Sequence, residues 1–226
     1  MSKLPLFSAV IFDMDGLVLD TEATYSIAWQ KAASNMGYEF SEDFCLSMSG
    51  LHSEAVKQKL IEYCGAHFKL TEFAALSGQY WHEYVKQRGI PVKKGFFAVL
   101  SLLRANKIKF CLATNSPRVN ALECLRLASI EGVFSMVISI DEVNQGKPAP
   151  DIFLLAAEMI KIPITRCLVV EDSATGIQAA INAKAPSVFV PSVLPYDQVV
   201  AEKADYLVND LDELTEIILG SYIDPV

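Results

Sequence analysis

The sequence predicts an α/β protein: a mainly parallel sheet with a helical segment inserted after its first strand. Beyond Pro91, strand-like and helix-like patterns alternate, which indicates right-handed βαβ units and a parallel sheet. Residues 22–88, in contrast, carry apolar residues at helical spacing and contain no convincing strand. The apolar run at 7–12 belongs to the sheet, so the helical part interrupts it. A chain of 226 residues with 52% hydrophobic content suits one larger domain, or a core domain that carries an insert.

The first strand ends in two aspartates. Residues 10–12 continue an unbroken apolar run, which is typical of a strand inside a parallel sheet, and Asp13 and Asp15 follow in the order Asp-Met-Asp-Gly. Residues i and i+2 of an extended chain point to the same side, so both carboxylates are expected beyond the carboxyl end of the strand, where ligands bind in open α/β sheets. Such a pair indicates a divalent metal or acid/base chemistry. Taken alone, the same four residues also fit an ordinary Asp-Gly turn.

The inserted segment predicts three helices that each end at a glycine. Apolar residues recur at helical spacing and stop just before the glycine, which is a common helix end. The predicted helices cover 25–36, 56–64 and 73–84, and the glycines are Gly37, Gly65 and Gly89. We therefore expect a core formed by residues 1–19 and 89–226 and a small helical domain of residues 20–88.

Helices and strands in alternation account for the rest of the chain. A helix over 96–103 precedes a strand over 108–113, and the next helix begins at Pro117 with Ser116 as its N-cap. The remaining strands are expected at 136–140, 167–170, 187–190 and 206–208, and the remaining helices at 150–160, 174–184 and 211–219.

Two further groups of polar residues follow strands of the predicted sheet. Thr114, Asn115 and Ser116 come just before a helix, where free backbone N–H groups and hydroxyls can cradle a phosphate. Lys147 stands between a glycine and a proline, so its backbone is restrained and its ammonium can be placed reproducibly. Each group also fits a simpler interpretation, a helix cap with a turn in the first case and an exposed loop lysine in the second.

An acidic pair, Glu171 and Asp172, follows the strand predicted at 167–170. Together with the first pair of aspartates, these carboxylates can complete a Mg²⁺ site built from oxygen ligands. The alternative is that Asp172 or Ser173 only caps the helix that follows.

The amino-acid composition limits the classes of binding partner and the cellular compartment that we expect. The net charge of −8 argues against nucleic acid or an anionic membrane as the main partner, but a local pocket with a lysine and a metal can still bind a small phosphorylated metabolite. The five cysteines are odd in number and scattered, which predicts buried thiols in a reducing compartment. No signal peptide or membrane span is evident. We expect a cytoplasmic monomer.

Four segments in this order resemble the haloacid dehalogenase-like superfamily. They read DMDGLVLDT, ATNS, GKPAPDIF and VVEDSATGIQAA, and the likeness covers essentially the whole chain. It implies a Rossmann-like core. The chain is most similar to the beta-phosphoglucomutase-like phosphohydrolases, which carry a helical cap domain after the first strand, and residues 20–88 fit that cap.

The resemblance implies a reaction through a phosphorylated aspartate. Asp13 would be the nucleophile that attacks phosphorus, and Asp15 would be the general acid and then the general base. An aspartate at position 15 favours phosphate-ester chemistry, because dehalogenases and phosphonate hydrolases of this fold lack it.

The resemblance also assigns the ligands of the metal and of the phosphoryl group. Mg²⁺ would be held by the Asp13 carboxylate, the Asp15 backbone carbonyl and Asp172, with Glu171 nearby. The phosphoryl oxygens would be bound by Thr114, by the backbone at Asn115 and by Lys147, with Ser116 in the same cradle.

The resemblance leaves the choice between hydrolase and mutase to residues 20–88. Sugar phosphomutases of this group carry a histidine and an arginine there, at positions that correspond to Tyr25 and Ser53 here, so we favour a Mg²⁺-dependent phosphatase acting on a sugar or nucleoside monophosphate. A beta-phosphoglucomutase-type mutase is the alternative enzyme, and a non-catalytic phosphometabolite sensor is the alternative of another class. His52, in a turn expected to face the core, is either a substrate contact or a polar loop residue.

Overall fold

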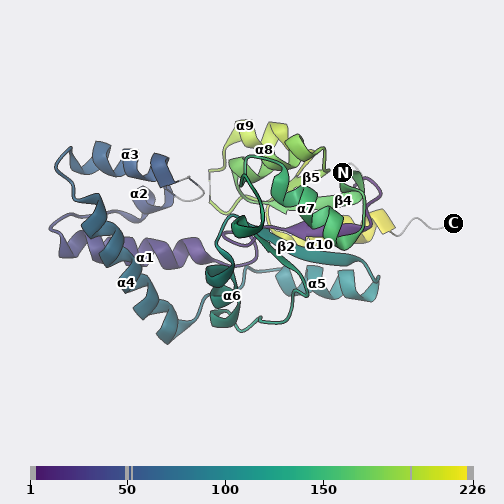
Figure 1. Ribbon diagram of the computed structural model, residues 1–226, viewed down its shortest axis with the longest axis horizontal. Helices are drawn as coiled ribbons and strands as arrows, with labels where there is room; N and C mark the ends of the chain where they lie inside the picture. Colours follow the sequence, from purple (N-terminus) through teal and green to yellow (C-terminus); the bar gives the residue numbers. More distant parts are fainter. Residues whose placement is uncertain (1–3, 49–50, 52, 194, 223–226) are drawn as a thin grey trace. The chain divides into compact units, whose positions relative to one another are not determined.

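The computed structural model describes residues 4–48, 51, 53–193 and 195–222, and the chain divides into two compact units (Figure 1). Unit 1 comprises residues 1–19 and 92–226, and unit 2 comprises residues 20–91. The sequence places the second boundary slightly earlier, after residue 88.

Unit 1 is built on a six-stranded sheet in the order β3-β2-β1-β4-β5-β6, in which every neighbouring pair is parallel. The predicted α/β fold with a Rossmann-like parallel sheet is therefore confirmed. The central strand β1 has β2 on one side and β4 on the other, so the strand order reverses beside it. The strands are β1 (Ala9–Phe12), β2 (Lys109–Thr114), β3 (Val137–Ser139), β4 (Cys167–Glu171), β5 (Ser187–Phe189) and β6 (Tyr206–Leu207).

Helices cover both faces of the sheet, which explains the unbroken apolar run of β1. Ile11 lies in the cluster formed with α7 and α8, whereas the neighbouring Phe12 packs edge-on against Phe96 of α5, with ring centroids 5.9 Å apart. Helix α10 packs against α5. The helices of unit 1 are α5 (Phe96–Ala105), α6 (Arg118–Leu127), α7 (Asp151–Ile160), α8 (Ala174–Ala183), α9 (Gln198–Lys203) and α10 (Leu211–Tyr222), with short 3₁₀ turns η1 (Ile140–Glu142) and η2 (Ile164–Arg166).

The described part of unit 2 is helical and has its own apolar core. Helices α1 and α4 pack against each other, and the Trp81 indole N–H donates to the Thr24 hydroxyl at 2.9 Å. The glycines that follow α1, α3 and α4 all have positive φ angles, as helix-terminating glycines do. The helices are α1 (Thr21–Asn35), α2 (Glu42–Leu46), α3 (Ser53–Cys64) and α4 (Leu70–Arg88).

The predicted N-cap of α6 is wrong. Pro117 is the residue at the N-cap position, and the first free N–H of the helix, that of Arg118, donates to the Asp141 carboxylate at 2.7 Å. Because a carboxylate from the β3 side already caps the helix, the Ser116 hydroxyl is free to bond elsewhere. It donates to Asp15 at 2.9 Å.

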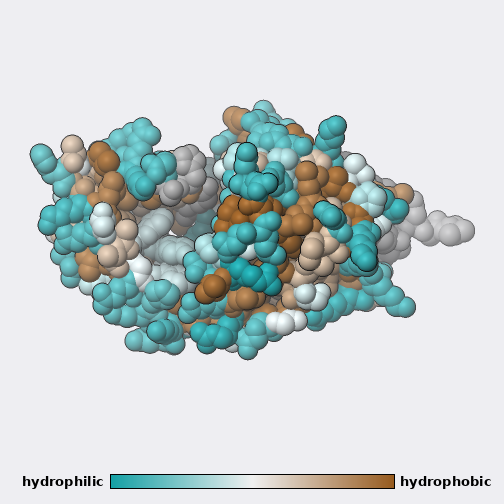
Figure 2. Space-filling model, viewed as in Figure 1, coloured by the Kyte–Doolittle hydropathy of each residue, from teal (hydrophilic) through white to brown (hydrophobic). Residues whose placement is uncertain are grey.

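The cysteines are all free thiols, as their scatter along the chain predicts. Four are buried and Cys64 is partly exposed. Hydrophilic side chains cover most of the visible surface, and apolar side chains show over α7 (Figure 2), where Leu154 and Met159 are exposed. None of the helices in the described residues is both long enough and apolar enough to cross a membrane.

Candidate active site

The carboxyl ends of β1, β2 and β4 bring the predicted core residues together. Phe12 pairs with Leu112 of β2 and with Val170 of β4, so the three strands end nearly level. Asp13 is the first residue after β1, Thr114 is the last residue of β2, and Glu171 is the last residue of β4. Side chains that lie about 100 and 160 positions apart in the sequence thus meet at one edge, as expected for a parallel sheet.

Lys147 is the cation at the centre of the site. Its Nζ donates to the Asp13 carboxylate, to Glu171 Oε1 at 2.5 Å and to the carbonyl oxygen of Ala113 at 2.9 Å. Lys147, Asp13 and Glu171 are all buried, and Glu171 is completely so. An ammonium group has three donors, and all three are used here, so a phosphoryl oxygen could bind this group only by replacing one of the protein contacts.

The electrostatics of the site favour an additional cation. Burial raises the pKa of Asp13 well above its ordinary value, the Glu171 carboxylate and Asp15 raise it as well, and Lys147 lowers it. Burial lowers the pKa of Lys147, but the carboxylates of Asp13 and Glu171 outweigh this and the net pKa lies above its usual value. One lysine therefore faces several carboxylates that repel one another.

The side chain of Asn115 forms hydrogen bonds with the backbone of Lys147. The Asn115 amide donates to the Lys147 carbonyl oxygen at 3.1 Å and accepts from the Lys147 N–H at 2.9 Å. The Lys147–Pro148 peptide bond is cis. The sequence indicated Asn115 only through its backbone, so this role of its side chain was not predicted.

Asp15 contacts hydroxyl groups at the end of β2. Its Oδ2 accepts from Ser116 Oγ at 2.9 Å and from Thr114 Oγ1 at 3.5 Å. The backbone N–H of Ser116 donates to Thr114 Oγ1 at 3.0 Å. The hydroxyls that the sequence indicates as a phosphate cradle thus bind the second aspartate, and their contact with a phosphoryl group stays a prediction.

Three buried carboxylates form a cluster with the donors that Mg²⁺ prefers. Oxygens of Asp13, Glu171 and Asp172 all lie within 4.8 Å of one another, and this is the one such acidic group found among the described residues. Two glycines make room for it. A Cβ on Gly16, whose φ is +82°, would lie 2.1 Å from Asp172 Oδ2, and a Cβ on Gly176 would lie 1.8 Å from Glu171 Cδ. The donor set is all oxygen, so the cluster fits Mg²⁺.

Ser173 connects the acidic pair to the start of α8. Its hydroxyl donates to Glu171 Oε2 at 3.0 Å and accepts from the Gly176 N–H at 3.1 Å. The helix-cap interpretation of this segment is therefore correct for Ser173, whereas metal binding by Glu171 and Asp172 stays a prediction. Gly16 and Gly176 were not predicted as site residues, although Gly16 directly follows Asp15 and Gly176 comes four residues after Asp172. His52 lies outside the described residues.

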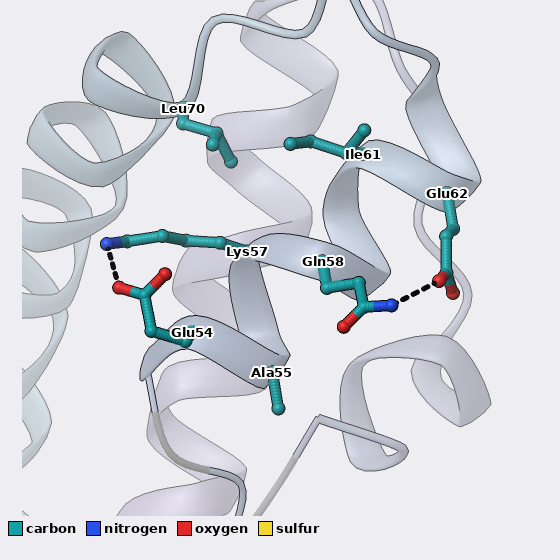
Figure 3. A pocket seen from close by; sticks show the side chains of 7 residues that line it. All are labelled: Glu54, Ala55, Lys57, Gln58, Ile61, Glu62 and Leu70. Atoms are coloured by element: carbon teal, nitrogen blue, oxygen red, sulfur yellow. Dashed lines mark hydrogen bonds and ion pairs between the residues drawn. The ribbon is translucent and has the colours of Figure 1, made fainter.

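A separate hollow of about 540 Å³ lies within unit 2 (Figure 3). Its polar side chains pair with one another along α3: Lys57 with Glu54 at 2.6 Å and Gln58 with Glu62 at 3.0 Å. It contains none of the site residues that the sequence predicts.

Comparison with known proteins identifies the family. A sequence model of haloacid dehalogenase-like hydrolases matches residues 7–184. The chain belongs to the haloacid dehalogenase-like hydrolase family. The resemblance in the sequence is thereby confirmed, as is the prediction of an enzyme of the phosphoric monoester hydrolase class.

Three proteins that are similar to this chain in sequence or structure are named for different activities on phosphorylated compounds. A "Phosphorylated carbohydrates phosphatase" of Thermotoga maritima is 33% identical over 178 residues, covering 77% of this chain and 81% of the relative. A "Probable pseudouridine-5'-phosphatase" of Drosophila melanogaster is 35% identical over 198 residues, covering 80% of each. The crystal structure of beta-phosphoglucomutase from Clostridium difficile superimposes with a TM-score of 0.72 at 25% identity, over 96% of this chain and 97% of that one.

Proposed function

We propose that this hydrolase is a Mg²⁺-dependent phosphatase that cleaves a small phosphorylated metabolite, a sugar or nucleoside monophosphate, through an aspartyl-phosphate on Asp13. The observation that carries the proposal is the buried Asp13 carboxylate, held at the end of β1 by the ammonium of Lys147. A carboxylate fixed by a cation at the ligand-binding edge of a parallel sheet is placed for nucleophilic attack.

In the first step, a carboxylate oxygen of Asp13 forms a bond to phosphorus while the ester P–O bond breaks. The leaving oxygen takes a proton from Asp15, which acts as general acid. In the second step, water attacks the same phosphorus and gives a proton back to Asp15, while the bond between phosphorus and the Asp13 carboxylate oxygen breaks. This releases inorganic phosphate and restores both aspartates.

The contacts of Asp15 support its role in proton transfer. Ser116 and Thr114 donate to Oδ2, so these hydroxyls orient the carboxylate. Orientation matters because a general acid acts only within hydrogen-bond reach of the atom it protonates. Lys147 keeps Asp13 beside the reaction centre and offsets its charge.

The acidic cluster fits Mg²⁺, and Asp13, Asp172 and Glu171 would hold the ion. Bound there, Mg²⁺ would supply positive charge that lets an anionic nucleophile and an anionic phosphate approach each other. The net negative charge of the site, with one lysine among several buried carboxylates, is the physical reason to expect this requirement.

The substrate class is inferred from the relatives that are named for phosphorylated carbohydrates and for pseudouridine 5'-phosphate. The test is a phosphate-release screen over sugar, nucleotide and polyol phosphates, with Mg²⁺ and with EDTA. We expect release that needs Mg²⁺ and that disappears in Asp13→Asn. Asp212→Asn, on the exposed side of α10, is the control and should keep full activity. If Asp13→Asn kept full turnover, Asp13 would not be the nucleophile.

A sugar phosphomutase is the second candidate, because the fold matches beta-phosphoglucomutase over nearly the whole chain. Incubation with β-glucose 1-phosphate and a bisphosphate primer distinguishes the two. A mutase produces the 6-phosphate, whereas the proposed phosphatase produces inorganic phosphate.

A further inference from the structure

Both backbone hydrogen-bonding groups of Lys147 are held by one side chain, that of Asn115. Lys147 lies in the loop between η1 and α7, outside the helices and strands of unit 1, so no sheet ladder fixes this peptide. The Asn115 amide bonds the Lys147 peptide much as a neighbouring strand would.

The chemistry of this contact calls for asparagine. A side-chain amide offers a donor and an acceptor side by side. An aspartate at position 115 would have no donor for the Lys147 carbonyl, and a glutamine would be one methylene longer. Alanine would lose both bonds.

Gly146 permits the close approach of Asn115. A Cβ at position 146 would lie 2.6 Å from Asn115 Oδ1 and 2.3 Å from Ile140 Cδ1. Both atoms lie at the far ends of flexible side chains, so an added methyl group would displace these side chains and leave the backbone in place. Asn115 would then swing away from Lys147.

We propose that Asn115 is a positioning residue that acts through Lys147. Its amide fixes the lysine backbone, and the backbone sets where the four-carbon stem delivers the ammonium between Asp13, Glu171 and the Ala113 carbonyl. The kinetic consequence rests on the proposed phosphatase function, whereas the position of the Lys147 ammonium can be tested without it.

The first test compares Asn115→Ala with Asn144→Ala, which removes an exposed asparagine of the same loop. With the phosphate ester that the wild-type protein hydrolyses best, Asn115→Ala should lower kcat roughly tenfold, with KM changed by less than about threefold, because the ammonium serves the nucleophile rather than substrate uptake. Asn144→Ala should match the wild type. Equal kcat values for the two variants would overturn the proposal, as would a loss confined to KM.

The second test combines the variant with Gly146→Ala. If both changes act by separating Asn115 from Lys147, the double variant should be no slower than the slower single variant. Multiplied losses would show that the two positions act independently and would overturn this route. Circular dichroism spectra should confirm that each variant is folded.

The third test needs no turnover. Crystal structures of the wild-type protein and of Asn115→Ala should show the Lys147 ammonium displaced from Asp13 in the variant, and an unmoved ammonium would overturn the proposal. If the wild-type protein released no phosphate from any ester, the proposed function would fail, and this structural comparison would still decide the role of Asn115.

Discussion

Replacing Lys147 by methionine, which has a side chain of similar length and no charge, should lower the free energy of unfolding of unit 1 by about 3–5 kcal/mol at pH 8. The Lys147 side chain is only 3% exposed, and its carboxylate partners Asp13 and Glu171 are 10% and 0% exposed. The variant leaves two buried carboxylates without a cation, which is the costly half of a buried ion pair. At about 2–4 °C per kcal/mol, the melting temperature should fall by roughly 6–20 °C.

The loss should depend on pH, and its sign follows from Asp13. Burial and Glu171 raise the pKa of Asp13, and Lys147 lowers it, so the variant has a still higher folded-state pKa for this group. The unfolded-state value is about 3.9, so the folded state of the variant holds its proton more tightly than the unfolded state does. Stability therefore falls as pH rises from about 4 through the folded-state pKa. The difference from the wild type should be small near pH 4 and largest at pH 8.

Urea unfolding in EDTA at pH 5 and pH 8, followed by far-ultraviolet circular dichroism, measures the effect. Both tryptophans, Trp29 and Trp81, lie in unit 2, so their fluorescence follows that unit separately and should change little. Lys94→Met is the matched control, because the Lys94 side chain is 83% exposed and an exposed ion pair contributes little. An equal loss at both pH values, or none at pH 8, would refute the reasoning.

Two further predictions concern a glycine and the thiols. In an ordinary helix, Gly176→Ala would add up to about 1 kcal/mol of stability. Here it should destabilise the protein and weaken Mg²⁺ binding in a calorimetric titration, because the new methyl group collides with Glu171. A more stable variant with unchanged Mg²⁺ affinity would contradict this prediction. Burial raises the pKa of Cys167 to about 11 and that of Cys124 to about 12, so these thiols should react with Ellman's reagent at pH 8 only after unfolding, whereas the partly exposed Cys64 should react in the folded protein. Rapid native labelling of Cys124 or Cys167, located by mass spectrometry, would contradict the burial argument.

The elements that sequence patterns predicted are those whose apolar residues recur over several turns or fill a whole strand. The five-residue α2 and the six-residue α9 were missed, because such lengths carry no readable period. Helix α2 depends instead on a local cap, the Ser41 hydroxyl that accepts from the Phe44 N–H. Strand ends shifted by single residues, so Thr114 closes β2 instead of opening the loop.

The sequence located the acidic pairs and the lysine, but not which groups contact each other. The order β2-β1-β4 decides that Lys147 reaches both Asp13 and Glu171, and no local pattern encodes strand order. The Ser116 hydroxyl turned to Asp15 because a carboxylate distant in sequence took over the helix cap. Which hydrogen-bond partner a hydroxyl takes depends here on residues that are close only in the folded structure, so the local sequence cannot predict it.

The chain leaves unit 1 and returns to it at paired positions. Leu19 forms an antiparallel bridge with Val92, and the Lys93 N–H donates to the Val18 carbonyl at 2.9 Å. The base of the 72-residue insertion, residues 20–91, is thus tied like the base of a hairpin, so a longer, shorter or unrelated segment could start and finish there without moving a strand of the sheet. Because the acidic cluster and Lys147 belong entirely to unit 1, the insertion can diverge or be exchanged by recombination while the reacting groups are inherited unchanged.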